Sequence, residues 1–164
     1  METASIVFER VPLYQLAESC VDMLQVSAEK HQVNLGFAGI PCSVMGNKEM
    51  IEEVLYNLCD NAIRYNNVDG SVRVTVEPLK DKVCFAVEDT GIGISPKHQQ
   101  RIFERFYRVD KSRSKATGGT GLGLVIVKHI IAQYGAELYL ESEEGKGTKI
   151  SILFDRAEEY SEPS

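Results

Sequence analysis

The sequence predicts an α+β protein: a two-layer α/β sandwich whose mixed sheet of about five strands is covered on one face by about three helices. Several short segments alternate apolar and polar residues, which is typical of half-buried strands. Longer segments repeat apolar residues every three or four positions, which is typical of helices with one buried face. The chain has 164 residues, the length of one domain with a real core.

The first part of the chain predicts one helix among short strands. Residues 6–11 are expected to form a strand, and Pro12 opens a helix that runs to about Lys30. Proline suits the first helical position because its missing N–H is not needed there. Residues 33–37 and 42–45 are expected to be short strands on either side of a Gly-Pro turn.

The middle of the chain predicts a second helix followed by a hairpin. Asn47 is a good N-cap for a helix from Lys48 to about Tyr65, and residues 66–70 then form a turn. Valines alternate with polar residues over 72–77, and apolar residues alternate again over 83–87. These two strands are expected to pair as a hairpin that closes near residues 79–81.

The last part of the chain predicts a short helix, a polar segment, a buried helix and a final hairpin. Pro96 begins a helix to about Phe103, and the next polar stretch, 107–119, has no periodicity. Residues 121–134 are apolar nearly all round, so this helix is expected to be buried. Residues 137–142 and 149–154 form the hairpin. We therefore expect one domain over 1–156 and a polar tail over 157–164.

Charge and cysteine content exclude several classes of function. The formal net charge is −6, which argues against general nucleic-acid binding. The four cysteines are widely spaced without a close pair, so neither a zinc site nor a redox motif is indicated. Cys59 and Cys84 lie among apolar residues and are expected to be small core residues. A reduced, cytoplasmic compartment follows, and no apolar run is long enough to span a membrane.

Polar residues follow one edge of the second predicted helix. The residues are Asn57, Asn61, Arg64 and Tyr65. Spacings of three and four place Asn57 and Asn61, with Arg64 or Tyr65, along that edge. Carboxamide oxygens can ligate Mg²⁺, and a neighbouring base can contact phosphate. The alternative is an ordinary exposed polar face.

Asp89, Gly91 and Gly93 stand where a predicted buried strand ends. An ionised Asp there can accept the adenine amino group, and glycines let the backbone approach the base closely. Guanine carries a carbonyl at that position, so the same Asp would discriminate between the purines. The alternative is a simple turn that uses glycine for its backbone freedom.

A glycine-rich segment over 118–124 leads directly into the buried helix. Free N–H groups and the helix dipole can bind phosphate without net positive charge. The segment lacks the Lys-Ser/Thr of a phosphate-binding P-loop, and it follows a polar stretch rather than the strand of a dinucleotide-binding fold. The alternative is a flexible loop before a well-capped helix.

The stretch between these two motifs is basic in an otherwise acidic chain. Its basic residues outnumber its acidic residues, Glu104 and Asp110. The basic residues are Arg101, Arg105, Arg108, Lys111, Arg113 and Lys115. A basic segment that ends in glycines suits a lid that closes over a triphosphate. The alternative is a solvated charged loop. Residues 145–148 are read either as a further glycine motif or as a plain hairpin turn.

Taken in order, these segments resemble the ATP-binding catalytic domain of bacterial sensor histidine kinases. The wider family, with the Bergerat fold, includes gyrase and heat-shock chaperones. Residues 57–65 resemble its N box, 89–93 its G1 box, 103–106 its F box and 119–124 its G2 box, and 145–148 resemble its last glycine turn. The resemblance spans about Ile6 to Phe154, and 108–113 resembles the phosphate-responsive type of sensor kinase.

The resemblance implies roles for individual residues. Asn61 would be the Mg²⁺ ligand, with Asn57 supporting phosphate or metal, and Asp89 would read adenine. Arg108 would stabilise the γ-phosphate. Asn57, Arg64 and Arg108 are thus the implied catalytic residues. The implied ATP contacts are Asn57, Asn61, Arg64, Tyr65, Asp89, Gly91, Gly93, Tyr107, Arg108, Gly119, Thr120, Gly121, Leu122, Gly123, Leu124 and Thr148.

The resemblance also implies partners that this chain does not contain. Sensor kinases phosphorylate a histidine on a dimerisation domain, within a His-Glu/Asp…Pro motif. His31, His98 and His129 lack that context and are read as structural or surface residues. We therefore expect an excised, monomeric catalytic domain, without its sensor and dimerisation domains. The parent protein would be a membrane-anchored homodimer, with this domain in the cytoplasm, that passes phosphate to a response regulator receiver domain.

The residue at position 57 distinguishes phosphoryl transfer from hydrolysis of ATP. Hydrolytic relatives carry glutamate there as a general base, and asparagine cannot take a proton. A register shift would make Glu53 and Asn57 the hydrolytic pair, but Ala62 and Tyr65 after Asn61 argue against it. Two alternatives to a histidine kinase remain: a nucleotide-binding or docking module with little turnover, and a serine kinase of the anti-sigma type.

Overall fold

The computed structural model of the protein describes residues 7–99 and 123–157. The expected end of the short helix near Phe103, the F box and the basic stretch lie outside these residues. The first two residues of the helix predicted over 121–134 lie outside them as well.

The main sheet has five strands and is mixed, as the sequence predicts. Its strands stand in the order β2-β4-β5-β7-β6. They are β2 (Asn34–Gly39), β4 (Ser71–Pro78), β5 (Lys82–Asp89), β7 (Gly147–Asp155) and β6 (Glu137–Glu143). The β2–β4 pair is parallel and the other pairs are antiparallel. The expected β4–β5 hairpin is present, with Leu79 N–H donating to the Lys82 carbonyl at 2.8 Å.

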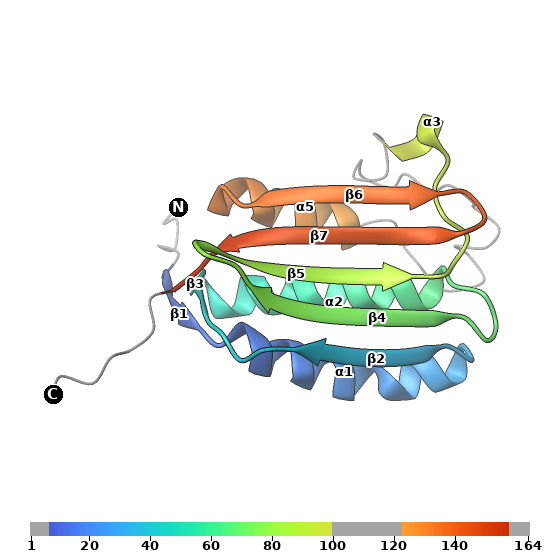
Figure 1. Ribbon diagram of the computed structural model, residues 1–164, viewed down its shortest axis with the longest axis horizontal. Coiled ribbons are helices and arrows are strands. Elements are labelled where there is room, and N and C mark those ends of the chain that lie inside the picture. The colour runs from blue at the N-terminus through green and yellow to red at the C-terminus, as the bar shows by residue number, and fades with distance from the viewer. Residues whose placement is uncertain (1–6, 100–122, 158–164) are drawn as a thin grey trace, which may run out of the picture.

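Three long helices cover one face of this sheet, and none of the described helices covers the other face (Figure 1). They are α1 (Leu13–Lys30), α2 (Lys48–Arg64) and α5 (Gly123–Tyr134). The short α3 (Pro96–Gln99) lies beside the end of β6. The predicted two-layer sandwich is therefore confirmed. No helix in the part of the chain that the structure describes is both long and apolar enough to span a membrane.

A separate two-stranded sheet lies beside the main one. β1 (Glu9–Val11) pairs antiparallel with β3 (Val44–Gly46). Asn47, directly after β3, caps α2 as predicted: its Oδ1 accepts a hydrogen bond from Met50 N–H at 3.1 Å. The Asn47 N–H also donates to the Tyr134 hydroxyl at 2.9 Å, which ties the start of α2 to the end of α5.

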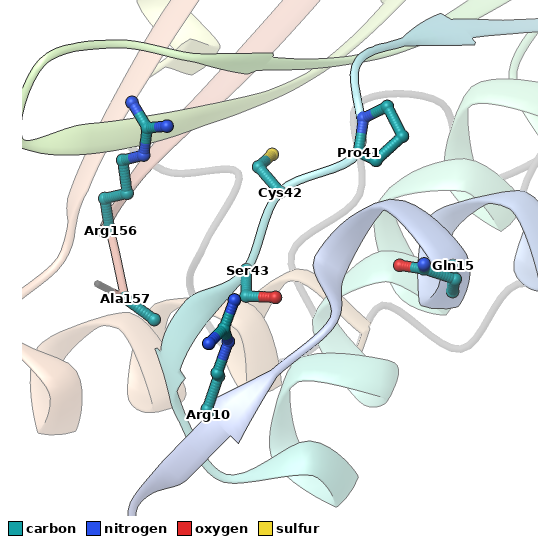
Figure 2. Close-up of a pocket in the computed structure, with 7 residues that line it drawn as sticks. All are labelled: Arg10, Gln15, Pro41, Cys42, Ser43, Arg156 and Ala157. Atoms are coloured by element: carbon teal, nitrogen blue, oxygen red, sulfur yellow. The ribbon is translucent and has the colours of Figure 1, made fainter. Parts of the chain in front are cut away.

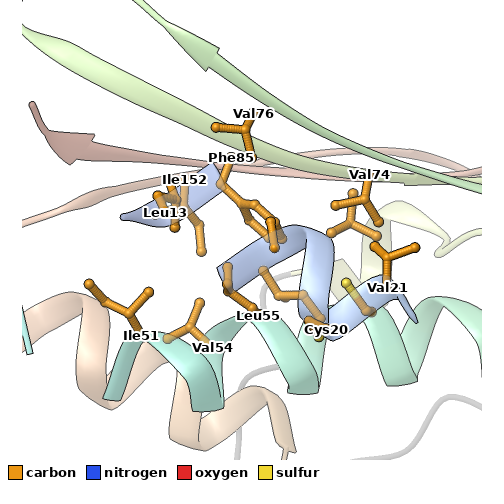
Figure 3. Packing of buried hydrophobic residues seen from close by; sticks show 14 of the residues in the cluster. Leu13, Cys20, Val21, Ile51, Val54, Leu55, Val74, Val76, Phe85 and Ile152 are labelled. Carbon is orange, nitrogen blue, oxygen red and sulfur yellow. The ribbon is translucent and has the colours of Figure 1, made fainter. Parts of the chain in front are cut away.

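One hydrophobic core fills the space between the helices and the sheet (Figure 3). Phe85 and Val74 point from the sheet toward the layer of helices. Strand residues alternate between the faces of a sheet, so every second residue of β4 and β5 enters this core. The alternation corrects one prediction. Cys59 is buried, but Cys84 lies on the opposite face from its neighbour Phe85 and is only half-buried.

Candidate functional site

Three segments that are far apart in the sequence meet at one end of the sheet, on the right in Figure 1. They are the end of α2, the residues that follow β5, and the β6–β7 turn. The Ile92 N–H donates to the Tyr65 carbonyl at 3.4 Å, and the Gly145 N–H donates to the Ile92 carbonyl at 2.7 Å. The fold therefore places the predicted N box, G1 box and last glycine turn side by side.

Asp89 is the last residue of β5 and is half-buried in this site. Its Oδ1 accepts hydrogen bonds from the N–H groups of Gly91 at 2.9 Å and Thr148 at 3.2 Å. Within the described residues, Oδ2 makes no hydrogen bond. Burial raises the pKa of Asp89 to about 6, against the lowering effect of the two N–H bonds. The carboxylate is therefore mostly ionised at neutral pH and keeps one oxygen available as an acceptor.

The glycines of this site let backbone segments touch. A Cβ on Gly91 would lie 2.5 Å from the Tyr65 carbonyl oxygen. Gly93 has a φ of 70°, and a Cβ there would collide with the Glu143 backbone. Gly147 has a φ of 136° and packs against the Asp89 carbonyl in the same way. Side chains would push the three segments apart, so these glycines set the shape of the site.

The polar edge of α2 presents two carboxamide oxygens. The Asn57 Nδ2 donates to the Glu53 carbonyl, and the Asn61 Nδ2 donates to the Asn57 carbonyl, each at 2.8 Å. A carbonyl only accepts, so each amide nitrogen must face the helix backbone and each Oδ1 must face away from it. Neither Oδ1 has a hydrogen-bond partner among the described residues. Oxygen is the atom type that Mg²⁺ prefers.

The end of α2 adds a cation beside these oxygens. The Arg64 Nε donates to Asp60 Oδ2 at 2.9 Å, and both side chains are partly buried. This ion pair lies within one helical turn of Asn61, so it holds the guanidinium near the predicted metal ligand. Tyr65 is the C-cap residue, and its N–H donates to the Asn61 carbonyl.

Sequence reasoning missed two residues that tie the site together. The Ser142 Oγ accepts from Ile94 N–H at 2.8 Å, donates to the Gly147 carbonyl at 3.0 Å and lies 2.7 Å from Thr148 Oγ1. Asn66 is buried, and its Nδ2 donates to the Ser71 carbonyl at 2.9 Å. The Asn-Asn pair after α2 was a signal for Asn66, although we read it only as a turn. A lone serine in a strand carries no signal.

The structure does not place every predicted site residue. Tyr107, Arg108, Gly119, Thr120, Gly121 and Leu122 lie outside the described residues, as does the basic stretch. Gly123 and Leu124 are the first two residues of α5, which packs against α2. The helix that follows the glycine-rich segment is thus a neighbour of the helix with the two asparagines.

The three histidines lie on helices or at a helix end. The His31 Nδ1 is 2.8 Å from the Ser27 carbonyl at the end of α1, and His129 is exposed on α5. His98 is half-buried in α3.

A family model described as histidine kinase-, DNA gyrase B-, and HSP90-like ATPase matches residues 46–158. The phosphate regulon sensor protein PhoR of Haemophilus influenzae is 42% identical over 113 residues, which cover 69% of this chain and 27% of that protein. The sensor-like histidine kinase SenX3 of Mycolicibacterium smegmatis is 35% identical over 156 residues, which cover 94% of this chain and 40% of that one. The chain thus spans less than half the length of these relatives.

A solved structure of a histidine kinase domain has a similar fold. The catalytic domain of histidine kinase ThkA superposes with a TM-score of 0.80 and 25% identity, covering 92% of this chain and 97% of that one. The match over residues 46–158 contains the α2 asparagines, Asp89 and Thr148, the described parts of the site. The chain belongs to the histidine kinase-, DNA gyrase B-, and HSP90-like ATPase family.

Proposed function

We propose that this chain is the ATP-binding catalytic domain of a sensor histidine kinase. It positions Mg-ATP for transfer of the γ-phosphoryl group to a histidine on a separate dimerisation domain. The observation that carries the proposal is the polar edge of α2, where Asn57 and Asn61 offer carboxamide oxygens. A carboxamide takes no proton at neutral pH, so Asn57 cannot serve as the general base that hydrolysis of ATP by water needs.

Asp89 is the proposed adenine reader. Its Oδ2 accepts a hydrogen bond from the exocyclic amino group, while Oδ1 is held by the N–H groups of Gly91 and Thr148. Those two bonds fix the carboxylate before the nucleotide arrives. A guanine would place a carbonyl oxygen against the ionised carboxylate and would be repelled.

The Asn61 Oδ1 is the proposed Mg²⁺ ligand, and the Asn57 Oδ1 supports the metal or a phosphate. In the described part of the chain, no three His, Cys, Asp or Glu side chains could hold a metal ion together. Mg²⁺ suits a site with few protein oxygens because it keeps several waters and shares phosphate oxygens with the substrate. The metal, when bound, neutralises phosphate charge. Asn61 and Arg64 orient the triphosphate along α2.

The remaining parts of the proposal rest on sequence alone. Tyr107 and Arg108 close over the nucleotide, and residues 119–124 bind its phosphates at the start of α5. Arg108 stabilises the transferring γ-phosphoryl group. Such a site works by positioning and charge stabilisation, which is most of what phosphoryl transfer requires.

The proposed partners lie outside this chain. They are the parent's own dimerisation and phosphoacceptor domain and a response regulator receiver domain. The names of the relatives, which are sensor proteins and sensor kinases, support this assignment. We propose that the parent protein is a membrane-anchored homodimer and that this domain faces the cytoplasm.

The transfer step is tested with γ-labelled ATP, Mg²⁺ and a separate dimerisation-domain fragment. We expect acid-labile label on the fragment, which is the signature of phosphohistidine. Acid-stable label would indicate a serine kinase instead. Label released only as free phosphate would indicate an ATPase, and binding without turnover would indicate a docking module.

The metal site is tested by Asn61→Ala, with Asn34→Ala as a matched control because Asn34 is an exposed asparagine on the edge strand β2. We expect Asn61→Ala to weaken nucleotide binding about tenfold or more in Mg²⁺, the size of a lost charge-assisted contact. In the presence of a metal chelator, the two variants should bind the nucleotide with equal affinity. Equal binding of Asn61→Ala and the control in Mg²⁺ would overturn the metal assignment.

A further inference from the structure

A hollow lies at the other end of the molecule from the candidate nucleotide site. It is a cavity of about 330 Å³. Its lining residues come from β1, the start of α1, the segment before β3 and the chain after β7 (Figure 2). They are Arg10, Gln15, Pro41, Cys42, Ser43, Arg156 and Ala157. None of them has a role in the proposed nucleotide site.

The two sites are separated by the length of the sheet. Arg156 directly follows Asp155, which pairs with Lys82 at the start of β5. Asp89 stands at the end of the same strand and pairs with Thr148. A strand rises about 3.4 Å per residue, so the cavity lies roughly 25 Å from Asp89. It is a separate site.

The described lining of the cavity carries positive charge. Among the described residues that line it, Arg10 and Arg156 are ionised, and none is an Asp or a Glu. Arg10 has no carboxylate partner in the part of the chain that the structure describes. The charge of Arg156 reaches the cavity, since it lowers the pKa of the Cys42 thiol, which burial raises more strongly. Such a lining stands out in a chain whose net charge is −6.

The start of α1 adds to this potential. Its N-cap is Pro12, which makes no side-chain cap, and its first turn carries no acidic residue. Gln15 of that turn lines the cavity. The first turn of this 18-residue helix therefore adds no negative side chain against the positive end of the helix dipole.

The cavity walls are fixed by hydrogen bonds between separate segments. The Arg156 N–H donates to the Asp81 carbonyl at 3.1 Å, and its Nη1 donates to the Leu79 carbonyl at 2.8 Å. The Ala157 N–H donates to the Ser43 carbonyl at 3.0 Å. These bonds hold the chain after β7 against the β4–β5 turn and the segment before β3, so the hollow is formed in advance.

We propose that this cavity, here called the arginine pocket, binds a small ligand through one carboxylate or phosphate group. The Arg10 guanidinium provides the charged hydrogen bonds, because its fork of N–H donors matches both groups. Ser43 and Gln15 provide neutral donors. The volume is at the lower end of the range of small-molecule sites, so the ligand is a small metabolite or ion.

Cys42 provides a built-in reporter, and Cys84 provides the matched control. Both thiols are half-buried and both pKa values are raised by burial, but only Cys42 lines the arginine pocket. Each is alkylated at alkaline pH with anionic iodoacetate and neutral iodoacetamide, and sites are read by peptide mass spectrometry. We expect the iodoacetate-to-iodoacetamide rate ratio to be several-fold higher at Cys42 than at Cys84. In Arg10→Gln the Cys42 ratio should fall to that of Cys84.

Ligand protection completes the test. The nucleotide site is first saturated with Mg²⁺ and a non-hydrolysable ATP analogue, so that added anions do not act there. Inorganic phosphate or succinate is then titrated against sodium chloride of equal ionic strength. We expect at least one of the two anions to protect Cys42 from alkylation in a saturable way. This protection should be absent in Arg10→Gln. The anion that protects identifies the chemical group that the pocket recognises.

Two results would overturn the arginine pocket. One is an equal reagent ratio at Cys42 and Cys84 in the unaltered protein. The other is protection by neither anion beyond the effect of sodium chloride. Circular dichroism of Arg10→Gln checks that it folds, which is expected because the Arg10 side chain is exposed.

Discussion

At the scale of single residues, Asp89 combines burial with a proposed role, recognition of adenine, that requires charge. Burial raises its pKa to about 6, so the folded protein takes up a proton as the pH falls through that value. The protonated carboxyl is a poorer acceptor for the adenine amino group than the carboxylate. Nucleotide binding should therefore lose the contribution of Asp89 as the pH falls from 7 to 5.

The comparison of unaltered protein with Asp89→Asn isolates this effect, because titration of the nucleotide phosphates is common to both. We expect Asp89→Asn to bind ATP about tenfold or more weakly at pH 7, the size of a lost charged hydrogen bond. The difference in ATP affinity between the two proteins should shrink toward pH 5, because the Asp89 carboxylate of the unaltered protein becomes protonated. Calorimetric titration at several pH values measures it. Equal affinities at pH 7 would refute the adenine assignment.

A comparison of Gly93 with Gly145 separates the energetic cost of backbone strain from that of a collision with neighbouring backbone. Both have positive φ, 70° and 84°, but a Cβ on Gly145 meets nothing within 4 Å, whereas one on Gly93 meets the Glu143 backbone. Gly145→Ala should cost about 1 kcal/mol of unfolding free energy, from φ alone. Gly93→Ala should cost at least about 2 kcal/mol more and should also weaken ATP binding. Urea unfolding measures both, and equal costs would contradict the proposed contact.

At the scale of elements, local pattern predicted which segments form strands and helices. The valine alternation identified β4, and Asn47 located the start of α2. Local pattern did not predict strand order. The parallel pairing of β2 with β4 depends on how α1 and α2 pack across the sheet, which no short segment encodes.

The same distinction applies to the candidate site. Asp89 could be proposed because a carboxylate at a strand end suggests a ligand contact, and Asn57 and Asn61 because two carboxamides lie along one helix edge. Ser142 was not, because its importance comes from its position opposite Ile94 and Thr148 in the folded sheet. Its hydroxyl has a role only once β6 pairs with β7.

The cap of α2 gives a prediction at this scale. Asn47→Ala removes the acceptor for Met50 N–H and should lower the unfolding free energy by about 1 kcal/mol. Asn47→Asp keeps that acceptor and adds a charge that suits a helix N-terminus, so it should retain most of the stability. Thermal unfolding measures both. If Asn47→Asp loses as much unfolding free energy as Asn47→Ala, the loss does not come from the helix cap.

At the scale of the whole molecule, one core connects the helices with the main sheet. Phe85 is fully buried at its centre, and Phe85→Ala should cost about 3–5 kcal/mol of unfolding free energy. Tyr139→Ala, on an exposed strand position, is the control and should cost much less.

The core also predicts that the chain unfolds as one domain. Unfolding in urea should show a single transition, coincident by circular dichroism and by tyrosine fluorescence. Phe85→Ala should shift both curves together. Two separated transitions would show that the helices and the sheet do not form one cooperative unit.

The length of the sheet makes the two sites energetically independent. Charges that face solvent are screened within about 8 Å at physiological salt, and roughly 25 Å separates the arginine pocket from Asp89. Arg10 also lies on β1, outside the five-stranded sheet that carries Asp89. Arg10→Gln should therefore leave the Kd for Mg²⁺ and a non-hydrolysable ATP analogue within about twofold, as expected for sites without shared partners. A larger change, measured by calorimetry, would mean that the arginine pocket communicates with the nucleotide site through the main sheet.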